Sequence, residues 1–182
     1  SKAFAMEEVR YYFLIILSAI AIIFIDIFDM FSGAFEALTH AAFQVGSIIT
    51  TTGFSTLDFN LWPQTSKMIL VLLMFIGACA GSTAGGAKID RIIVIVKFIK
   101  NEFYRMLHPN TVTTVRINGN GTPTGVLHKS LAFMFLYLLV IVIGGLLLVA
   151  TGLNAQEGFF YSLAAISNTG LDSEILGLNF TY

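Results

Sequence analysis

The sequence predicts an all-α polytopic membrane protein in which a unit of spanning helix, re-entrant helix and loop occurs twice. Three observations predict this class. The 182 residues are 56% hydrophobic and 12% charged, about half the charged fraction of a soluble domain. Two short stretches that lie 117 positions apart align without a gap. Lys and Arg are concentrated in a few segments, as in membrane proteins whose loops face opposite sides.

The composition also excludes several classes of function. A net charge of −1 gives no electrostatic signal for nucleic-acid binding. The single cysteine, Cys79, allows no internal disulfide and supplies too few ligands for a zinc site. We expect no cofactor in this chain.

Residues 11–28 predict the first spanning helix, because they are apolar except for Asp26 and long enough to cross the hydrocarbon core. Residues 31–48 are too polar to face lipid. They fit a re-entrant helix enclosed by protein, where a partial span is tolerated at membrane depth. Its polar residues are Glu36, Thr39, His40, Gln44 and Ser47. We expect His40 to be a hydrogen-bonded imidazole rather than a metal ligand.

Residues 67–107 predict a helix that glycines interrupt. The apolar stretch 67–80 runs into a glycine-rich segment, and the helix resumes at about Ile89. It ends before Pro109, because proline disrupts a helix interior. Residues 1–107 thus form one complete predicted unit of helix, pore loop and broken helix.

The second half of the chain repeats this plan. Residues 108–127 read as a polar cytoplasmic linker with turn-forming Asn, Gly and Pro residues. Residues 130–151 carry no charge and predict a spanning helix, and residues 155–167 repeat the re-entrant pattern. We therefore expect residues 128–182 to be a second unit that lacks its last helix, within a fragment of a longer protein.

The charges predict the orientation in the membrane. Seven of the ten Lys and Arg residues lie in residues 88–129, and Lys2 and Arg10 precede the first span. By the positive-inside rule these segments are cytoplasmic, so both re-entrant loops enter from outside. The outer segments carry only acids, which would raise the local cation concentration or simply be solvated. They are Asp26, Asp29, Glu36, Asp58, Glu157, Asp172 and Glu174.

The aligned stretches cover residues 43–54 and 160–171, and both place hydroxyl residues before a glycine. Gly53 aligns with Gly170. Glycine adopts positive φ freely, so such a turn suits a backbone whose carbonyl groups face a dehydrated cation. The repeat predicts a cation pore.

The glycine-rich segment 77–87 has three interpretations. Gly81 and Gly86 have the spacing of a phosphate-binding loop, but Ala87 stands where that loop needs lysine. Gly77, Gly81 and Gly85 at four-residue intervals also fit a helix-packing face. The interpretation that we favour is an unwound stretch beside a polar cavity in mid-membrane.

Three motifs together resemble the Trk/Ktr/HKT potassium transporter family, most closely its bacterial pore subunit. They are Thr50-Thr51-Thr52-Gly53-Phe54-Ser55, Gly81-Ser82-Thr83-Ala84-Gly85-Gly86-Ala87-Lys88 and Ser167-Asn168-Thr169-Gly170. The resemblance covers nearly the whole chain. It implies four helix–pore-loop–helix units around a pseudo-fourfold axis, of which this fragment holds the third and an incomplete fourth. Ala87 and Leu171 depart from the family pattern, which often has Ile and Pro there.

The resemblance implies a role for each motif in potassium uptake across the inner membrane, with K⁺ as the substrate. The implied selectivity filter comprises Thr50, Thr51, Thr52, Gly53, Ser167, Asn168, Thr169 and Gly170. The implied gate loop beneath the filter comprises Gly77, Gly81, Ser82, Thr83, Gly85, Gly86 and Lys88. The implied partners are membrane lipid, the other pore units, a second copy in a homodimer and a cytoplasmic nucleotide-binding regulatory subunit.

Other functions stay open at this point. The related pore subunit of an ATP-driven potassium pump uses similar loops, and a membrane scaffold would use glycine faces only for packing. Ser82 with His40 would be the candidate pair of an intramembrane protease. Because no third group orients that pair, we expect the chain not to be an enzyme.

Overall fold

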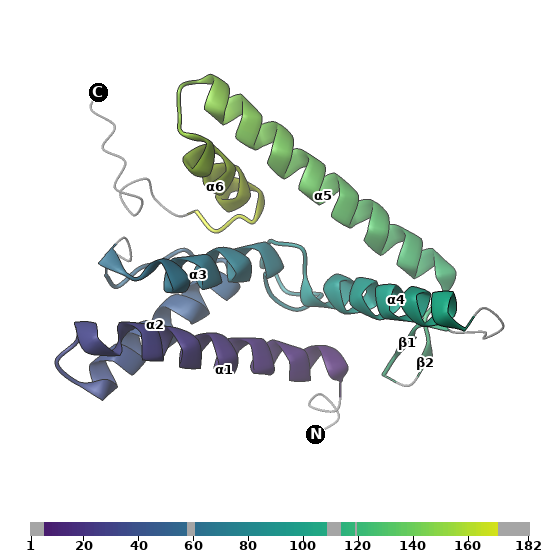
Figure 1. Cartoon of the computed structure of the whole chain (residues 1–182), viewed down its shortest axis with the longest axis horizontal. Coiled ribbons are helices and arrows are strands. Elements are labelled where there is room, and N and C mark those ends of the chain that lie inside the picture. The colour runs from purple at the N-terminus through teal and green to yellow at the C-terminus, as the bar shows by residue number, and fades with distance from the viewer. Residues whose placement is uncertain (1–5, 58–60, 109–113, 119, 171–182) are drawn as a thin grey trace.

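The computed structural model describes residues 6–57, 61–108, 114–118 and 120–170. These residues are mostly helical, as predicted, and their helices pack around one shared core (Figure 1). The elements in chain order are α1 (Glu7–Ile27), the 3₁₀ helix η2 (Phe28–Met30), α2 (Ala34–Ile49), α3 (Gln64–Ile76), α4 (Ile89–Leu107), β1 (Arg116–Ile117), β2 (Asn120–Gly121), α5 (Thr124–Ala150) and α6 (Ala155–Ile166).

Two helical stretches among the described residues are long and apolar enough to cross a membrane. They are Glu7–Met30, with 24 residues, and Gly125–Ala150, with 26 residues. Large apolar side chains on both stay exposed, such as Leu17 at 65% and Leu147 at 64%. Such surfaces are stable in lipid rather than in water.

The predicted broken helix is present as α3 and α4, which the glycine-rich segment separates. With 13 residues, α3 is about 20 Å long, too short to cross the hydrocarbon core alone. Helix α5 begins at Thr124, so its first turn lies within the segment that the sequence predicted as linker. Pro123 immediately before it has φ −58°, a dihedral that suits the entry to a helix.

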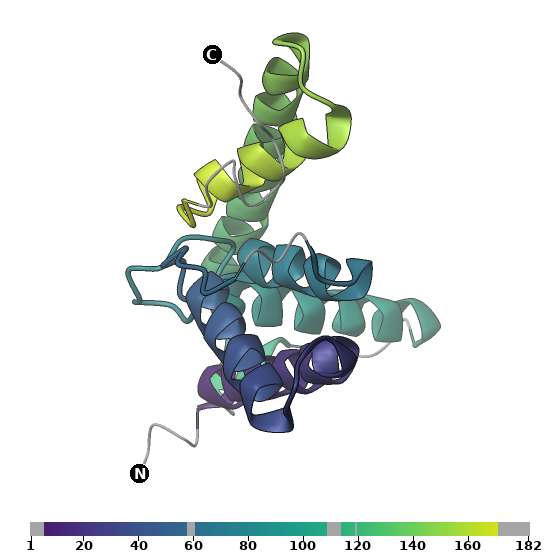
Figure 2. The ribbon, with the colours of Figure 1, turned by 90° about the vertical axis from the view of Figure 1, so that its left-hand side faces the viewer.

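The short helices α2 and α6 pack against the longer ones. Helix α2 lies against α1 and α3, and α6 lies against α5. The small side chains of Ala37 and Ala41 are completely buried on α2, with Val45 and Ile48 on the same face. Figure 2 shows the ends of α2 and α6 near the loop that joins α3 to α4.

The polar linker contains an antiparallel hairpin that sequence analysis did not predict. Arg116 pairs with Gly121, and Ile117 pairs with Asn120. Asn118 follows the first strand with φ +52°, a conformation that asparagine tolerates better than most residues. The turn-forming residues of the linker therefore make a hairpin rather than an open loop.

Asp26, predicted as an outer acid, caps the start of α3. Its Oδ2 accepts bonds from the backbone N–H of Ser66 at 3.1 Å and from the Ser66 hydroxyl at 2.6 Å. Ser66 lies in the first turn of α3, where N–H groups have no partner inside the helix. The Asp26 carboxylate of α1 therefore accepts the backbone hydrogen bond that an N-cap side chain of α3 would otherwise accept.

We expect Asp26→Ala to destabilise the protein by about 1 kcal/mol, the typical cost of losing a helix cap. The measurement is the thermal unfolding midpoint of the detergent-solubilised protein. Asp29→Ala is the matched control, because Asp29 lies one turn further along and is exposed. Equal midpoints for the two variants would contradict the capping role.

Candidate functional site

Residues 50–53, here called the first corner, leave the end of α2 in a tight turn. Thr51 has φ +55° and Gly53 has φ +77°. The backbone N–H of Thr52 donates to the carbonyl oxygen of Ser47 at 2.9 Å. The hydroxyl groups of Thr50 and Thr52 are hydrogen-bonded at 2.8 Å. The Thr50 and Thr52 side chains thus close the turn, and Thr51 and Gly53 both have left-handed backbone conformations.

Residues 167–170, the second corner, have the same conformation at the end of α6. Asn168 has φ +56° and Gly170 has φ +62°. The N–H of Thr169 donates to the carbonyl oxygen of Ala164 at 3.1 Å, and the Ser167 and Thr169 hydroxyls lie 2.7 Å apart. Each bond has its counterpart 117 positions earlier, so the sequence repeat is also a repeat of local backbone structure.

The two corners touch. A Cβ atom built on Gly53 would lie 1.9 Å from the carbonyl oxygen of Thr169. Because no side chain fits in that space, glycine is the residue that permits the contact. Segments more than a hundred residues apart are therefore brought together at the ends of two short helices.

Residues 77–88, here called the glycine-rich loop, leave the α3–α4 axis and return to it. The N–H of Ala87 donates to the carbonyl oxygen of Phe75 at 3.0 Å, and the N–H of Lys88 donates to that of Ile76 at 2.9 Å. Gly77 and Gly86 both have positive φ, and a Cβ on Gly86 would lie 2.9 Å from the Gly77 Cα. The base of the loop is therefore closed by backbone contact.

Side chains of the predicted gate motif hold the loop internally. The Ser82 hydroxyl donates to the carbonyl oxygen of Cys79 at 2.6 Å. The Lys88 ammonium donates to the carbonyl oxygen of Ser82 at 3.1 Å, so it binds the loop itself. Residues 77–88 are not helical, and the interpretation of Gly77, Gly81 and Gly85 as a helix-packing face is therefore wrong.

The glycine-rich loop contacts both corners. The N–H of Gly85 donates to the Thr51 hydroxyl of the first corner at 3.2 Å. A Cβ on Gly85 would lie 1.9 Å from the carbonyl oxygen of Ser167 in the second corner. Three glycine-containing segments, all singled out in the sequence, thus meet at one place.

Residues that sequence analysis did not assign to the site form hydrogen bonds on either side of the first corner. The Ser47 hydroxyl donates to the carbonyl oxygen of Phe54, and the Ser55 hydroxyl donates to Oε1 of Gln44 at 3.2 Å. Gln44 is 1% exposed, and its Nε2 has no hydrogen-bond partner within the described part of the chain. The signals in the sequence were that Gln44 and Ser47 are polar residues of an otherwise apolar helix and that these residues lie within the aligned repeat or the motif that follows it.

The other residues that the sequence offered as candidates for a site are His40 and the acidic residues. The His40 imidazole is hydrogen-bonded to the Thr56 hydroxyl at 2.9 Å and stacks on Phe31, so it has partners other than Ser82. In the part of the chain that the structure describes, no three His, Cys, Asp or Glu side chains form a possible metal site. The acids Asp58, Asp172 and Glu174 and the departure at Leu171 lie outside the described residues.

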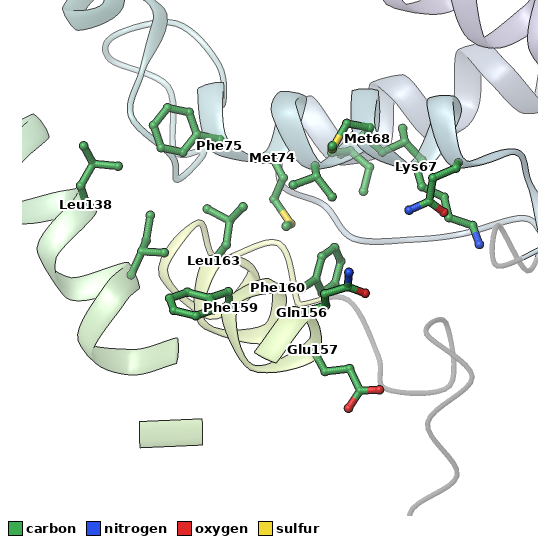
Figure 3. A pocket seen from close by; sticks show the side chains of 15 residues that line it. Lys67, Met68, Met74, Phe75, Leu138, Gln156, Glu157, Phe159, Phe160 and Leu163 are labelled. Atoms are coloured by element: carbon green, nitrogen blue, oxygen red, sulfur yellow. The ribbon is translucent and has the colours of Figure 1, made fainter. Parts of the chain in front are cut away.

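An apolar groove of about 640 Å³ lies between α3 on one side and α5 and α6 on the other. Figure 3 shows its lining by Met74, Phe75 and Leu163, with Gln156 and Glu157 near one end. An apolar wall cannot replace the hydration shell of a cation. The polar backbone at the two corners is therefore the better candidate for an ion site than this groove.

Two helices long and apolar enough to span a membrane, a helix interrupted by a glycine-rich loop and two matching turns are the features of a helical membrane protein. The chain belongs to the TrkH family of cation transport proteins, whose family model matches residues 9–178. As predicted, this is a family of transporters rather than enzymes.

The similar proteins are described as potassium uptake proteins or potassium transporters. The Trk system potassium uptake protein TrkH of Escherichia coli (strain K12) is 34% identical over 153 residues, 84% of this chain and 32% of that protein. The TrkH protein of Vibrio parahaemolyticus is 35% identical over 82% of this chain and 31% of its own length. The crystal structure of the potassium transporter TrkH from Vibrio parahaemolyticus superposes with a TM-score of 0.83 at 33% identity, covering 90% of this chain and 35% of that one. The chain thus spans about a third of the length of the relatives that it matches.

Proposed function

We propose that this chain contributes to a pore for potassium uptake across the cytoplasmic membrane, with K⁺ as its substrate. The observation that carries the proposal is the contact of both corners with each other and with the glycine-rich loop, in a chain of the TrkH family. In this proposal, residues 1–107 form one pore unit, residues 108–127 a cytoplasmic linker and residues 128–182 part of a second unit. Other units of the same protein complete the pore around a pseudo-fourfold axis.

The first and second corners supply part of the selectivity filter. Potassium must lose much of its water to enter a narrow filter, and main-chain carbonyl groups replace that water. Helices α2 and α6 end at the corners, so the partial negative charge of each C-terminus favours a cation there. The paired hydroxyls of each corner fix the turn that presents the backbone.

The glycine-rich loop is the gate. It is held against both corners by one hydrogen bond and by a backbone contact that has no room for a side chain. Its ends meet at Ile76 and Lys88, so the residues between them can move without displacing α3 or α4. We propose that the loop obstructs the ion path in this position and clears it when it moves.

The charge distribution supports an orientation for the pore. The N-terminus and residues 88–129 face the cytoplasm, and the corners are reached from outside. The basic cytoplasmic face would meet anionic lipid headgroups and the nucleotide-binding regulatory subunit. We propose a homodimer as the assembly.

The test is ion flux by the protein expressed from its whole gene and reconstituted in ATP-free liposomes. We expect Rb⁺ influx that external K⁺ suppresses and equal concentrations of Na⁺ leave largely unchanged. Equal suppression by Na⁺ would contradict the potassium filter. Flux that appears only after ATP is added would favour the pump subunit, and the absence of flux from folded protein both with and without ATP would favour the scaffold.

A further inference from the structure

Two adjacent glutamates in the first turn of α1 have partners in different parts of the chain. Glu8 contacts the glycine-rich loop, and Glu7 contacts α4 and the turn of the hairpin. Neither residue belongs to a motif that the sequence singled out. Both lie on the side of the molecule to which the proposed orientation assigns the cytoplasm.

Glu8 holds the tip of the glycine-rich loop. Its Oε1 accepts a hydrogen bond from the backbone N–H of Ala80, and its carboxylate also interacts with the Cys79 thiol. The base of the loop is buried at Gly77 and Gly86, whereas Ala80 and Gly81 at the tip are exposed. A Cβ on Gly81 would meet no atom within 4 Å, so packing does not position the tip. The hydrogen bond that the Ala80 N–H donates to Glu8 therefore supplies a hold that packing lacks.

Glu7 joins the same helix turn to the hairpin β1–β2. Its carboxylate forms an ion pair with Lys97 of α4, whose ammonium also donates to the carbonyl oxygen of Arg116 at 2.8 Å. Its backbone N–H donates to Oδ1 of Asn118 at 2.8 Å. A single half-exposed ion pair contributes little to stability. Here, however, Glu7 contacts both Lys97 and Asn118, and Lys97 in turn contacts Arg116, so the hairpin and the start of α1 are expected to move together.

We propose that Glu8 is a positioning residue for the glycine-rich loop and that Glu7 couples its position to the hairpin. The inference rests on the proposed role of the loop as the gate. Because residues 7 and 8 share one helical turn, a displacement of the hairpin reorients the carboxylate that holds Ala80. The hairpin is thereby the element through which an event on the cytoplasmic face changes the gate.

The first test compares Glu8→Leu with Glu8→Gln in the reconstituted whole protein. Leucine removes the acceptor for the Ala80 N–H, whereas the glutamine amide oxygen retains it. We expect Glu8→Leu to raise basal Rb⁺ influx by about fivefold or more, the lower end of measured allosteric couplings. Glu8→Gln should stay near the wild type. Glu102→Leu, which removes an exposed pair with Arg105 on the same side, is the matched control.

The second test measures coupling to the hairpin. We expect Lys97→Met to raise the flux in the wild-type background and to have no additional effect in the Glu8→Leu background, because both act on one contact. Independent effects of the two substitutions on flux would overturn the link through Glu7. Unchanged flux in Glu8→Leu, from a wild type that transports K⁺ selectively, would overturn the positioning role.

A third measurement does not depend on transport and therefore separates this inference from the proposed function. Amide hydrogen exchange over residues 77–88 should accelerate in Glu8→Leu and stay unchanged in Glu8→Gln and Glu102→Leu. Equal exchange in all these proteins would overturn the inference even if no ion flux were found. If exchange is faster in Glu8→Leu but the wild-type protein shows no potassium flux, the contact between Glu8 and Ala80 is supported and the proposed pore is refuted.

Discussion

Replacing Gly53 by serine is expected to abolish potassium-selective flux through the whole protein. The new Cβ would lie 1.9 Å from the carbonyl oxygen of Thr169, and Gly53 has φ +77°, a conformation that L-residues adopt at a cost of about 1–2 kcal/mol. One of the two corners must therefore move, and both are proposed to line the filter. We expect K⁺-selective flux to fall at least about a hundredfold, which corresponds to about 2.7 kcal/mol at the barrier.

The same substitution at two other glycines separates this effect from general damage. Gly170 has φ +62°, but no atom of the described residues lies within 4 Å of its Cβ position, so Gly170→Ser should let Na⁺ compete while retaining some flux. Gly33→Ser is the control, because Gly33 caps α2 with an extended backbone and serine is favoured at such a position. The measurements are Rb⁺ influx with K⁺ or Na⁺ as competitor, together with the yield of folded protein. Wild-type selectivity in Gly53→Ser would refute the assignment of the first corner to the filter.

Deleting residues 79–84 is expected to increase ion flux, because it removes the tip of the glycine-rich loop, including the exposed Ala80 and Gly81, and keeps its base. A Cβ on Gly77 would lie 2.3 Å from the Gly85 carbonyl oxygen, so the chain can be rejoined without a long gap. The bonds from Ala87 and Lys88 back to α3 remain available. We expect an increase of about tenfold, equivalent to about 1.4 kcal/mol removed from the barrier to conduction.

A control deletion tests whether loop length alone matters. Removing residues 117–120 shortens the hairpin, which the proposed orientation places on the cytoplasmic side, and removes no residue of the corners. Under the coupling proposed above, it should raise flux less than the gate deletion does, because the glycine-rich loop is still present. No gain in flux from well-folded protein without residues 79–84 would refute the gate. Flux that rises with loss of K⁺ over Na⁺ preference would show that the loop also supports the corners.

The spanning helices, the broken helix and the conformations of the corners could be predicted from the sequence. Apolar runs of sufficient length, interrupted by glycine, predict spanning and broken helices because membrane thickness sets helix length. The aligned glycines predicted turns with positive φ, and Gly53 and Gly170 have it. Helix length and turn conformation depend on residues that are neighbours in the chain, so both can be predicted from a short stretch of sequence.

The network of Glu7 and Glu8 and the cap that Asp26 supplies could not be predicted from the sequence. Asp26 and Ser66 lie 40 positions apart, and Glu8 and Ala80 lie 72 apart. An acidic residue near a helix end has many possible partners, and only the packing of the helices selects one. The hairpin was missed for a related reason, because strands of two residues leave almost no periodic pattern.

The amino-acid sequence by itself determined that this chain is a helical membrane protein with two matching turns, because hydrophobic length, charge asymmetry and glycine positions are read residue by residue along the chain. Only the tertiary structure decided that both turns touch, that the glycine-rich loop lies against them, and that the start of α1 holds the tip of that loop. Each of these contacts joins segments far apart in the chain. Such contacts form through the packing of the helices between them, which no local pattern encodes.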